Sequence, residues 1–158
     1  MVKFPWLKLI VALILPQLAG AVGGFFSAAS VLTWYPILLK PSFTPPGWIF
    51  GPVWGILYVM MGLALFFVLI SGQGKDKVRF AVGFFCVHLF INTLWSILFF
   101  GLRDPFLAFI DIIILWLMIA ALVFIFWRIR KFAGALMIPY WLWVSFAGVL
   151  NYTIWKMN

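Results

Sequence analysis

The amino-acid sequence predicts an all-α integral membrane protein, a bundle of five transmembrane helices that forms a single domain over residues 1–158. Hydrophobic residues make up 67% of the 158-residue chain and charged residues 9%, whereas a soluble domain is about half apolar and a quarter charged. Charged clusters divide the chain into apolar runs, each long enough for the roughly 20 residues that a membrane helix needs. The basic residues lie between these runs and form no continuous face, so the net charge of +8 does not indicate a nucleic-acid partner.

The first helix is expected near residues 7–27. Its basic start, its apolar stretch and the segment Ala19-Gly20-Ala21 resemble a secretory signal peptide with a cleavage site. The apolar character continues through Phe25 and Phe26, however. We therefore interpret this segment as a transmembrane helix.

A long connection over residues 28–46 follows. Its four prolines resist a continuous helix; they are Pro36, Pro41, Pro45 and Pro46. Long ordered loops in compact proteins are often functional. We expect this one to act as a lid.

The remaining helices are expected near residues 47–70, 79–100, 106–128 and 133–156, joined by short turns. Lysine and arginine are biased toward one side of this arrangement, which carries Lys3, Lys8, Lys75, Lys77, Arg79, Arg128, Arg130 and Lys131. The other side carries Lys40, Arg103 and Lys156. We expect a multi-pass protein of a bacterial or archaeal cell membrane, and in such a membrane the positive-inside rule predicts a cytoplasmic N-terminus.

Residues three or four positions apart share a helix face, and by this criterion unusual side chains gather on the inner faces of four helices. These are Phe50, Trp54 and Tyr58 on the second helix, His88, Asn92, Trp95 and Ser96 on the third, Asp111 on the fourth, and Trp143, Ala147 and Asn151 on the fifth. Counted at about 1.5 Å per residue, most of them lie in the leaflet beneath the proline-rich loop. This predicts an aromatic-walled pocket with a few polar groups.

Several of these residues have two interpretations. Asp111 is a functional group or pocket organiser, or a neutral acid hydrogen-bonded near the interface. His88 is a metal or haem ligand, or a partner of Asn92 one turn away. Asn92 contacts ligand or holds helices together. Gly20-x-x-x-Gly24 is a dimer contact or serves packing within the bundle.

Other chemistries find no support in the sequence. There is no glycine-rich phosphate loop, no zinc-ligand spacing and no Ser/His/Asp set. No lysine lies in the middle of a predicted helix, which excludes a retinal Schiff base. No metal site and no required cofactor are expected.

The aromatic and proline motifs resemble the TspO/MBR family of tryptophan-rich sensory proteins, relatives of the mitochondrial translocator protein. The motifs are Trp34-Tyr35-Pro36, Leu39-Lys40-Pro41-Ser42-Phe43-Thr44-Pro45-Pro46-Gly47-Trp48, Asn92-Thr93-Leu94-Trp95, Phe99-Phe100-Gly101, Pro139-Tyr140-Trp141-Leu142-Trp143 and Leu150-Asn151-Tyr152. Asp111 fits the family's fourth-helix aspartate. The resemblance covers nearly all of the chain after the first helix.

The resemblance implies a ligand pocket under the first loop that takes porphyrins, notably protoporphyrin IX or haem, and sterol-like molecules. Trp54 and Trp143 match the two pocket tryptophans tied to porphyrin binding and to its light-dependent breakdown. The other implied ligand-binding positions are Tyr35, Pro45, Phe50, Tyr58, Asn92, Trp95, Ser96, Asp111 and Ala147. His88 is added as a departure from the family pattern that could alter ligand preference.

Leu150, Tyr152 and Lys156 satisfy a proposed sterol-recognition pattern, which is weak by itself. The leading functional interpretation is a porphyrin-binding membrane sensor or translocator, surrounded by lipid and expected to form a homodimer. One alternative is an enzyme that degrades protoporphyrin IX with light or oxygen, with Trp54 and Trp143 as the catalytic participants. The other is a small-molecule transporter, against which the lack of an inverted repeat argues.

Overall fold

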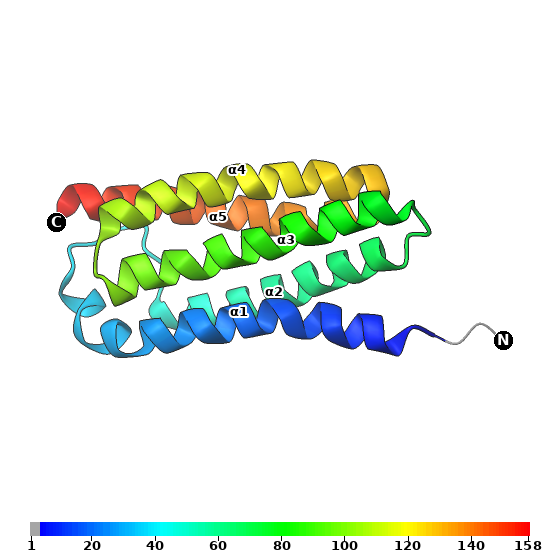
Figure 1. Cartoon of the computed structure of the whole chain (residues 1–158). Helices are drawn as coiled ribbons and strands as arrows, with labels where there is room; N and C mark the ends of the chain where they lie inside the picture. The colour runs from blue at the N-terminus through cyan, green and yellow to red at the C-terminus, as the bar shows by residue number, and fades with distance from the viewer. Residues whose placement is uncertain (1–3) are drawn as a thin grey trace.

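The computed structural model describes residues 4–158 and contains five long helices that run side by side (Figure 1). They are α1 (Trp6–Thr33), α2 (Gly47–Leu69), α3 (Lys75–Ser96), α4 (Pro105–Ile129) and α5 (Lys131–Met157). A 3₁₀ turn, η1 (Tyr35–Ile37), follows α1, and a π-helical segment, η2 (Ile97–Gly101), extends α3. All five spans are long and apolar enough to cross a membrane, which confirms the predicted fold class.

The helices close into a ring in the order α1–α2–α5–α4–α3, because each packs against its two neighbours in that order. The start of α1 and the end of α5 lie at opposite ends of the bundle (Figure 1), as an odd number of spans requires. One end holds the start of α1 and the short α2–α3 and α4–α5 connections, and we call it the basic end. The other holds the long loop and the end of α5, and we call it the loop end.

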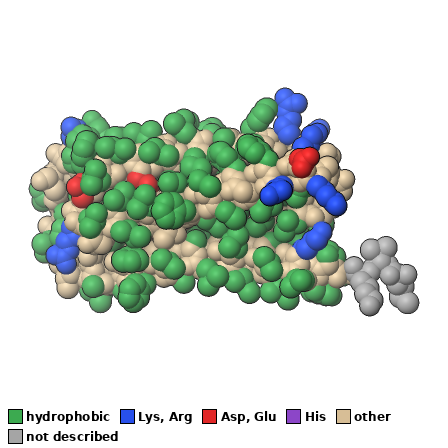
Figure 2. Space-filling view, in the orientation of Figure 1, with side chains coloured by type: hydrophobic (Ala, Val, Ile, Leu, Met, Phe, Trp, Pro, Cys, Tyr) green, Lys and Arg blue, Asp and Glu red, His purple; other side chains and the backbone are tan. Residues whose placement is uncertain are grey.

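Large apolar side chains cover the outside of the bundle. Phe25 is 79% exposed, Leu32 80% and Phe90 65%, and Figure 2 shows a green surface whose blue lysines and arginines lie toward the two ends. A soluble monomer rarely exposes apolar patches of this extent. Lipid is the solvent that this surface fits.

The first helix continues six residues beyond the predicted boundary at residue 27. No proline interrupts the chain between Pro16 and Pro36, and the hydroxyls of Ser27 and Thr33 bond to carbonyl oxygens one turn earlier. The connection is therefore residues 34–46, shorter than the expected 28–46. The third helix begins at Lys75 rather than residue 79, because its polar first turn lies beyond the apolar run.

The spacing between α1 and α2 differs along their length. Near the basic end they touch, since a Cβ atom on Gly62 would lie 2.8 Å from the carbonyl oxygen of Ala12. Toward the loop end they separate, and a Cβ atom on Gly24, Gly51 or Gly55 would meet no atom within 4 Å. The main apolar core accordingly fills the basic half of the bundle, while a smaller cluster around Phe99, Ala108, Leu150 and Ile154 lies at the loop end.

Candidate functional site

A cavity of about 740 Å³ lies inside the loop half of the bundle. All five helices contribute to it, together with η1 and η2. Nine of the predicted ligand-binding residues line it: Tyr35, Phe50, Trp54, Tyr58, Asn92, Trp95, Ser96, Trp143 and Ala147. Its volume is in the range of small-molecule and cofactor sites, about 300–1,000 Å³.

Aromatic rings form opposite walls of the cavity. On the α2–α5 side, Phe50 meets Trp143 edge to face at 5.9 Å between ring centroids. On the α3 side, Trp95 stacks on Phe99 at 5.1 Å. The π-helical η2 adds a residue to the turn that carries Phe99 and Phe100, which both line the cavity, and such segments are frequent at functional sites.

A chain of hydrogen bonds runs from the cavity floor into the core. Tyr58 donates its hydroxyl proton to the Asn92 carbonyl oxygen at 3.1 Å, and the Asn92 amide donates to the Tyr140 oxygen at 2.9 Å. The Tyr140 oxygen also lies 2.9 Å from His88 Nε2, and His88 Nδ1 lies 3.3 Å from the Phe85 carbonyl oxygen.

The direction of this chain follows from its chemistry. The Phe85 carbonyl oxygen can only accept, so His88 Nδ1 carries the proton and Nε2 accepts from the Tyr140 hydroxyl. The histidine is then neutral, with its proton on Nδ1 facing the Phe85 carbonyl oxygen. The predicted bond between His88 and Asn92 is wrong, because both side chains bind the Tyr140 hydroxyl instead.

Tyr140 is therefore the centre of a network that the sequence analysis quoted only as part of a motif. It is fully buried, as is His88. His88 does not line the cavity and lies behind Tyr140. Within residues 4–158 no group of three His, Cys, Asp or Glu side chains could hold a metal ion.

A second polar connection orders the loop-end wall. Trp95 Nε1 donates to the side-chain oxygen Oδ1 of Asn151 at 2.9 Å, and the side-chain amide Nδ2 of Asn151 donates to the backbone carbonyl oxygen of Pro105 at 2.8 Å. These bonds tie α3, α5 and the start of α4 together and set the plane of the Trp95 ring. The buried Trp143 Nε1, in contrast, has no hydrogen-bond partner among residues 4–158.

Asp111 lies behind the cavity wall and does not line it. It is 4% exposed, and its Oδ2 atom has no partner within the described chain. Its neighbours on α4, Ile112 and Leu115, supply that part of the lining. Pro45 does not line the cavity either. Ligand contact by Pro45, His88 and Asp111 therefore stays a prediction, and the lining gives it no support.

Helix α1 contributes to the cavity lining, which the sequence did not predict. Gln17, Gly20, Ala21, Gly24, Ser27 and Val31 line one side of the cavity. Their spacing of three and four residues was the available signal, but small residues at this spacing also suit helix dimers. Gly20 faces Tyr58, whose ring a Cβ atom would overlap, so Gly20 serves packing within the bundle. Gly24 is exposed and has no atom within 4 Å of its Cβ position, and the expected homodimer stays a prediction.

The cavity is open on its α1–α2 side. Its lining there includes six exposed residues: Gln17, Ala21 and Gly24 of α1, and Gly47, Gly51 and Gly55 of α2. The glycines leave this seam without side chains, at the height of the bilayer interior. The opening therefore faces lipid.

The loop over the cavity is held in place at several points. Lys40 Nζ donates to the carbonyl oxygens of Tyr35 at 2.8 Å and Leu38 at 2.9 Å. The Asn158 side chain accepts from the backbone N–H of Leu39 at 2.9 Å and donates to its carbonyl oxygen at 3.0 Å. Partial burial raises the pKa of the Tyr35 phenol above its usual value, which keeps this cavity-lining group neutral.

The three residues of the sterol pattern do not share one face. Leu150 is 6% exposed and lines the cavity, whereas Tyr152 is 44% exposed. Lys156 Nζ lies 3.8 Å from the ring centre of Trp155 and 5.8 Å from that of Tyr152. A sterol that touched Tyr152 and Lys156 would therefore lie outside the bundle, and sterol binding stays a prediction.

Comparison with known proteins gives one consistent result. The sequence pattern of the TspO/MBR family matches residues 12–156. A tryptophan-rich protein TspO of Archaeoglobus fulgidus is 41% identical over 153 residues, which are 96% of this chain and 97% of the relative. A tryptophan-rich protein TspO of Chlorobaculum tepidum is 42% identical over 139 residues, 88% of each chain, and the translocator protein of Bos taurus is 34% identical over 156 residues, 98% of this chain and 92% of the relative.

Proposed function

The chain belongs to the TspO/MBR family, and this membership supports a role as a membrane sensor or translocator. We propose that its cavity binds a porphyrin, with protoporphyrin IX as the leading candidate. The observation that carries the proposal is the cavity itself, about 740 Å³ with Trp54, Trp95 and Trp143 in its lining. A flat apolar macrocycle gains affinity from stacking on such rings and from leaving water or lipid.

The polar groups suit the edge of such a ligand. Ser96 contributes a hydroxyl group to the cavity lining. Tyr58 and Asn92 are already bonded to each other at the floor. The apolar macrocycle would lie between the indoles, and its carboxylate arms would point toward the loop end, where Lys40, Arg103 and Lys156 lie.

Tryptophan fluorescence tests the site. Protoporphyrin IX should quench the intrinsic fluorescence with saturation, and the Trp54→Ala/Trp143→Ala variant should lose the saturable phase. A matched control is Trp6→Ala/Trp48→Ala, since these indoles are 64% and 75% exposed and lie outside the cavity. Saturable binding that survives in a folded Trp54→Ala/Trp143→Ala variant would place the ligand elsewhere.

Breakdown of the bound porphyrin by light or oxygen is a second candidate function. It is favoured by the position of Trp54 and Trp143, two electron-rich indoles that both line the cavity. The test is product formation under illumination with and without oxygen, in proportion to protein. Photobleaching at the same rate with the Trp54→Ala/Trp143→Ala variant would exclude it.

A further inference from the structure

We propose that a second site, at the basic end, binds the headgroup of an anionic phospholipid. The site is a groove of about 700 Å³ between the start of α1, the α2–α3 turn and the first two turns of α3. It shares no lining residue with the cavity at the loop end. The inference is therefore independent of the porphyrin proposal.

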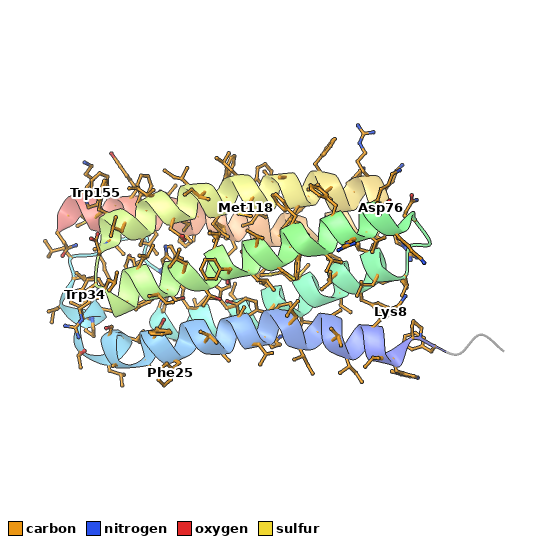
Figure 3. All side chains as sticks on the ribbon, viewed as in Figure 1. Lys8, Phe25, Trp34, Asp76, Met118 and Trp155 are labelled. Atoms are coloured by element: carbon orange, nitrogen blue, oxygen red, sulfur yellow. The ribbon has the colours of Figure 1, made fainter. Side chains whose placement is uncertain are left out.

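Positive charge converges on this groove. Lys8, Lys75 and Arg79 line it. The sole acidic residue before Asp104 is Asp76. Figure 3 places Lys8 and Asp76 at the same end of the bundle, and Figure 2 shows several blue side chains around one red patch there. Lys8 uses one of its three protons on the Leu69 carbonyl oxygen, at 3.1 Å.

Backbone donors add to this field. The first turn of α3 has no side-chain cap, and its N-terminal residue Lys75 lies in the groove wall beside Gly72 and Gln73. The first N–H groups of a helix have no intrahelical acceptor and carry partial positive charge. An acceptor with negative charge complements both these groups and the cationic side chains.

The apolar part of the groove favours a lipid over a free anion as the ligand. Leu69, Ile70, Val78 and Val82 share the lining with the cations. A phospholipid places a phosphate directly above apolar chains, and its glycerol region and upper acyl carbons match such a floor. Basic pockets between membrane helices at the bilayer surface suit lipid headgroups for this reason.

The three cationic side chains also favour one class of lipid headgroup over another. A zwitterionic headgroup carries an ammonium group that Lys8, Lys75 and Arg79 repel at short range. A phosphatidylglycerol headgroup has the phosphate without that cation. The groove should therefore prefer phosphatidylglycerol to phosphatidylcholine.

Spin-labelled lipids test the proposal on the full-length protein in phosphatidylcholine vesicles. Electron spin resonance measures the protein-immobilised fraction of doxyl-labelled phosphatidylglycerol and phosphatidylcholine. The wild-type protein should prefer the former, and Lys75→Gln/Arg79→Gln should reduce that preference, by about fivefold per charge removed at most. Lys8→Gln removes one charge on a different helix and should reduce the preference for phosphatidylglycerol by the amount for one charge, about fivefold at most.

The control removes the same charge from the same end outside the groove. Lys77 and Lys131 are exposed and do not line it, so Lys77→Gln/Lys131→Gln should retain the preference. An equal loss in both double variants would overturn the site in favour of diffuse attraction. Displacement of the labelled lipid by inorganic phosphate, against chloride at equal ionic strength, would overturn the lipid assignment in favour of a free-anion site.

Discussion

At the scale of single residues, the chain from Tyr58 to His88 shows how one side chain controls the next. Tyr140 accepts from Asn92 and donates to His88, which fixes the orientation of the Asn92 amide and leaves its carbonyl oxygen for Tyr58. The polar face that the cavity floor presents is thus decided by residues that do not touch a ligand. In an apolar interior, a donor or acceptor that loses its partner lowers the stability of the fold by more than the intact hydrogen bond contributes to it.

The variant His88→Leu tests this coupling. It leaves the Tyr140 hydroxyl without an acceptor, so we expect a loss of about 1–3 kcal/mol of stability. Removing the hydroxyl as well, in His88→Leu/Tyr140→Phe, should cost less than the sum of the single variants. Unfolding in mixed micelles measures all four proteins of the cycle, and strictly additive losses would show that the two side chains are not coupled.

At the scale of elements, glycine sets how closely α1 and α2 approach. Gly62 brings them into contact near the basic end, whereas Gly51 and Gly55 leave a seam without side chains near the loop end. The same residue type therefore closes one half of a helix pair and opens the other. The physical difference is whether a neighbouring backbone occupies the space where Cβ would be.

Filling the seam should slow ligand uptake from the bilayer. The variant Gly51→Leu/Gly55→Leu places two side chains over the opening, and we expect the association rate of porphyrin to fall about tenfold, the effect of roughly 1.4 kcal/mol on a barrier. Gly83→Leu is the control, since Gly83 is an exposed α3 glycine with free space around it. Stopped-flow mixing with loaded vesicles measures the rate. An unchanged rate in the seam variant would mean that ligand arrives through the loop.

The side chain of Asn158, the residue after α5, is one of the groups that hold the loop over the cavity. Asn158→Ala removes two hydrogen bonds to Leu39, each worth about 1 kcal/mol. If the loop closes the site, porphyrin should dissociate roughly five- to thirtyfold faster, with a smaller change in association. Displacement kinetics measure this, with the exposed neighbour variant Met157→Ala as control. Equal dissociation rates would identify the loop as a connector only.

At the scale of the whole molecule, the distribution of lysine and arginine predicts the orientation of the bundle in the membrane. The basic end carries seven lysines and arginines within residues 4–158, namely Lys8, Lys75, Lys77, Arg79, Arg128, Arg130 and Lys131, against three at the loop end, Lys40, Arg103 and Lys156. By the positive-inside rule we expect the loop and its cavity to face the outside of the cell if the host is a bacterium or an archaeon.

Thiol labelling measures the orientation. In a Cys86→Ala background, a cysteine at Ser42 in the loop should react with an impermeant reagent in intact cells, and a cysteine at Gln73 in the α2–α3 turn should not. Both positions are exposed. Permeabilised cells, in which both should react, serve as the control. The opposite pattern would reverse the assignment and would move the phospholipid groove to the outer leaflet.

The number of spans, their approximate limits and the family could be predicted from the amino-acid sequence alone. These properties follow from local composition, because each helix must satisfy its own backbone hydrogen bonds in lipid and must be long enough to cross it. The depth of the polar residues also followed, since depth depends only on the rise per residue. The aromatic residues of α2, α3 and α5 could be assigned to one pocket on that basis.

Which of those residues face the cavity depends on how the helices pack, and this could not be predicted from the sequence. Asp111 and His88 lie at useful depths but behind the wall, because the direction in which a side chain points depends on how each helix is rotated against its neighbours. The α1 wall was missed for a related reason: a stripe of glycine and alanine looks the same in the sequence whether it meets another chain, a neighbouring helix or an empty space. Tyr140 became the centre of the polar network because the packing of α5 against α3 brings its hydroxyl within hydrogen-bond distance of both Asn92 and His88, and no local pattern in the sequence contains that information.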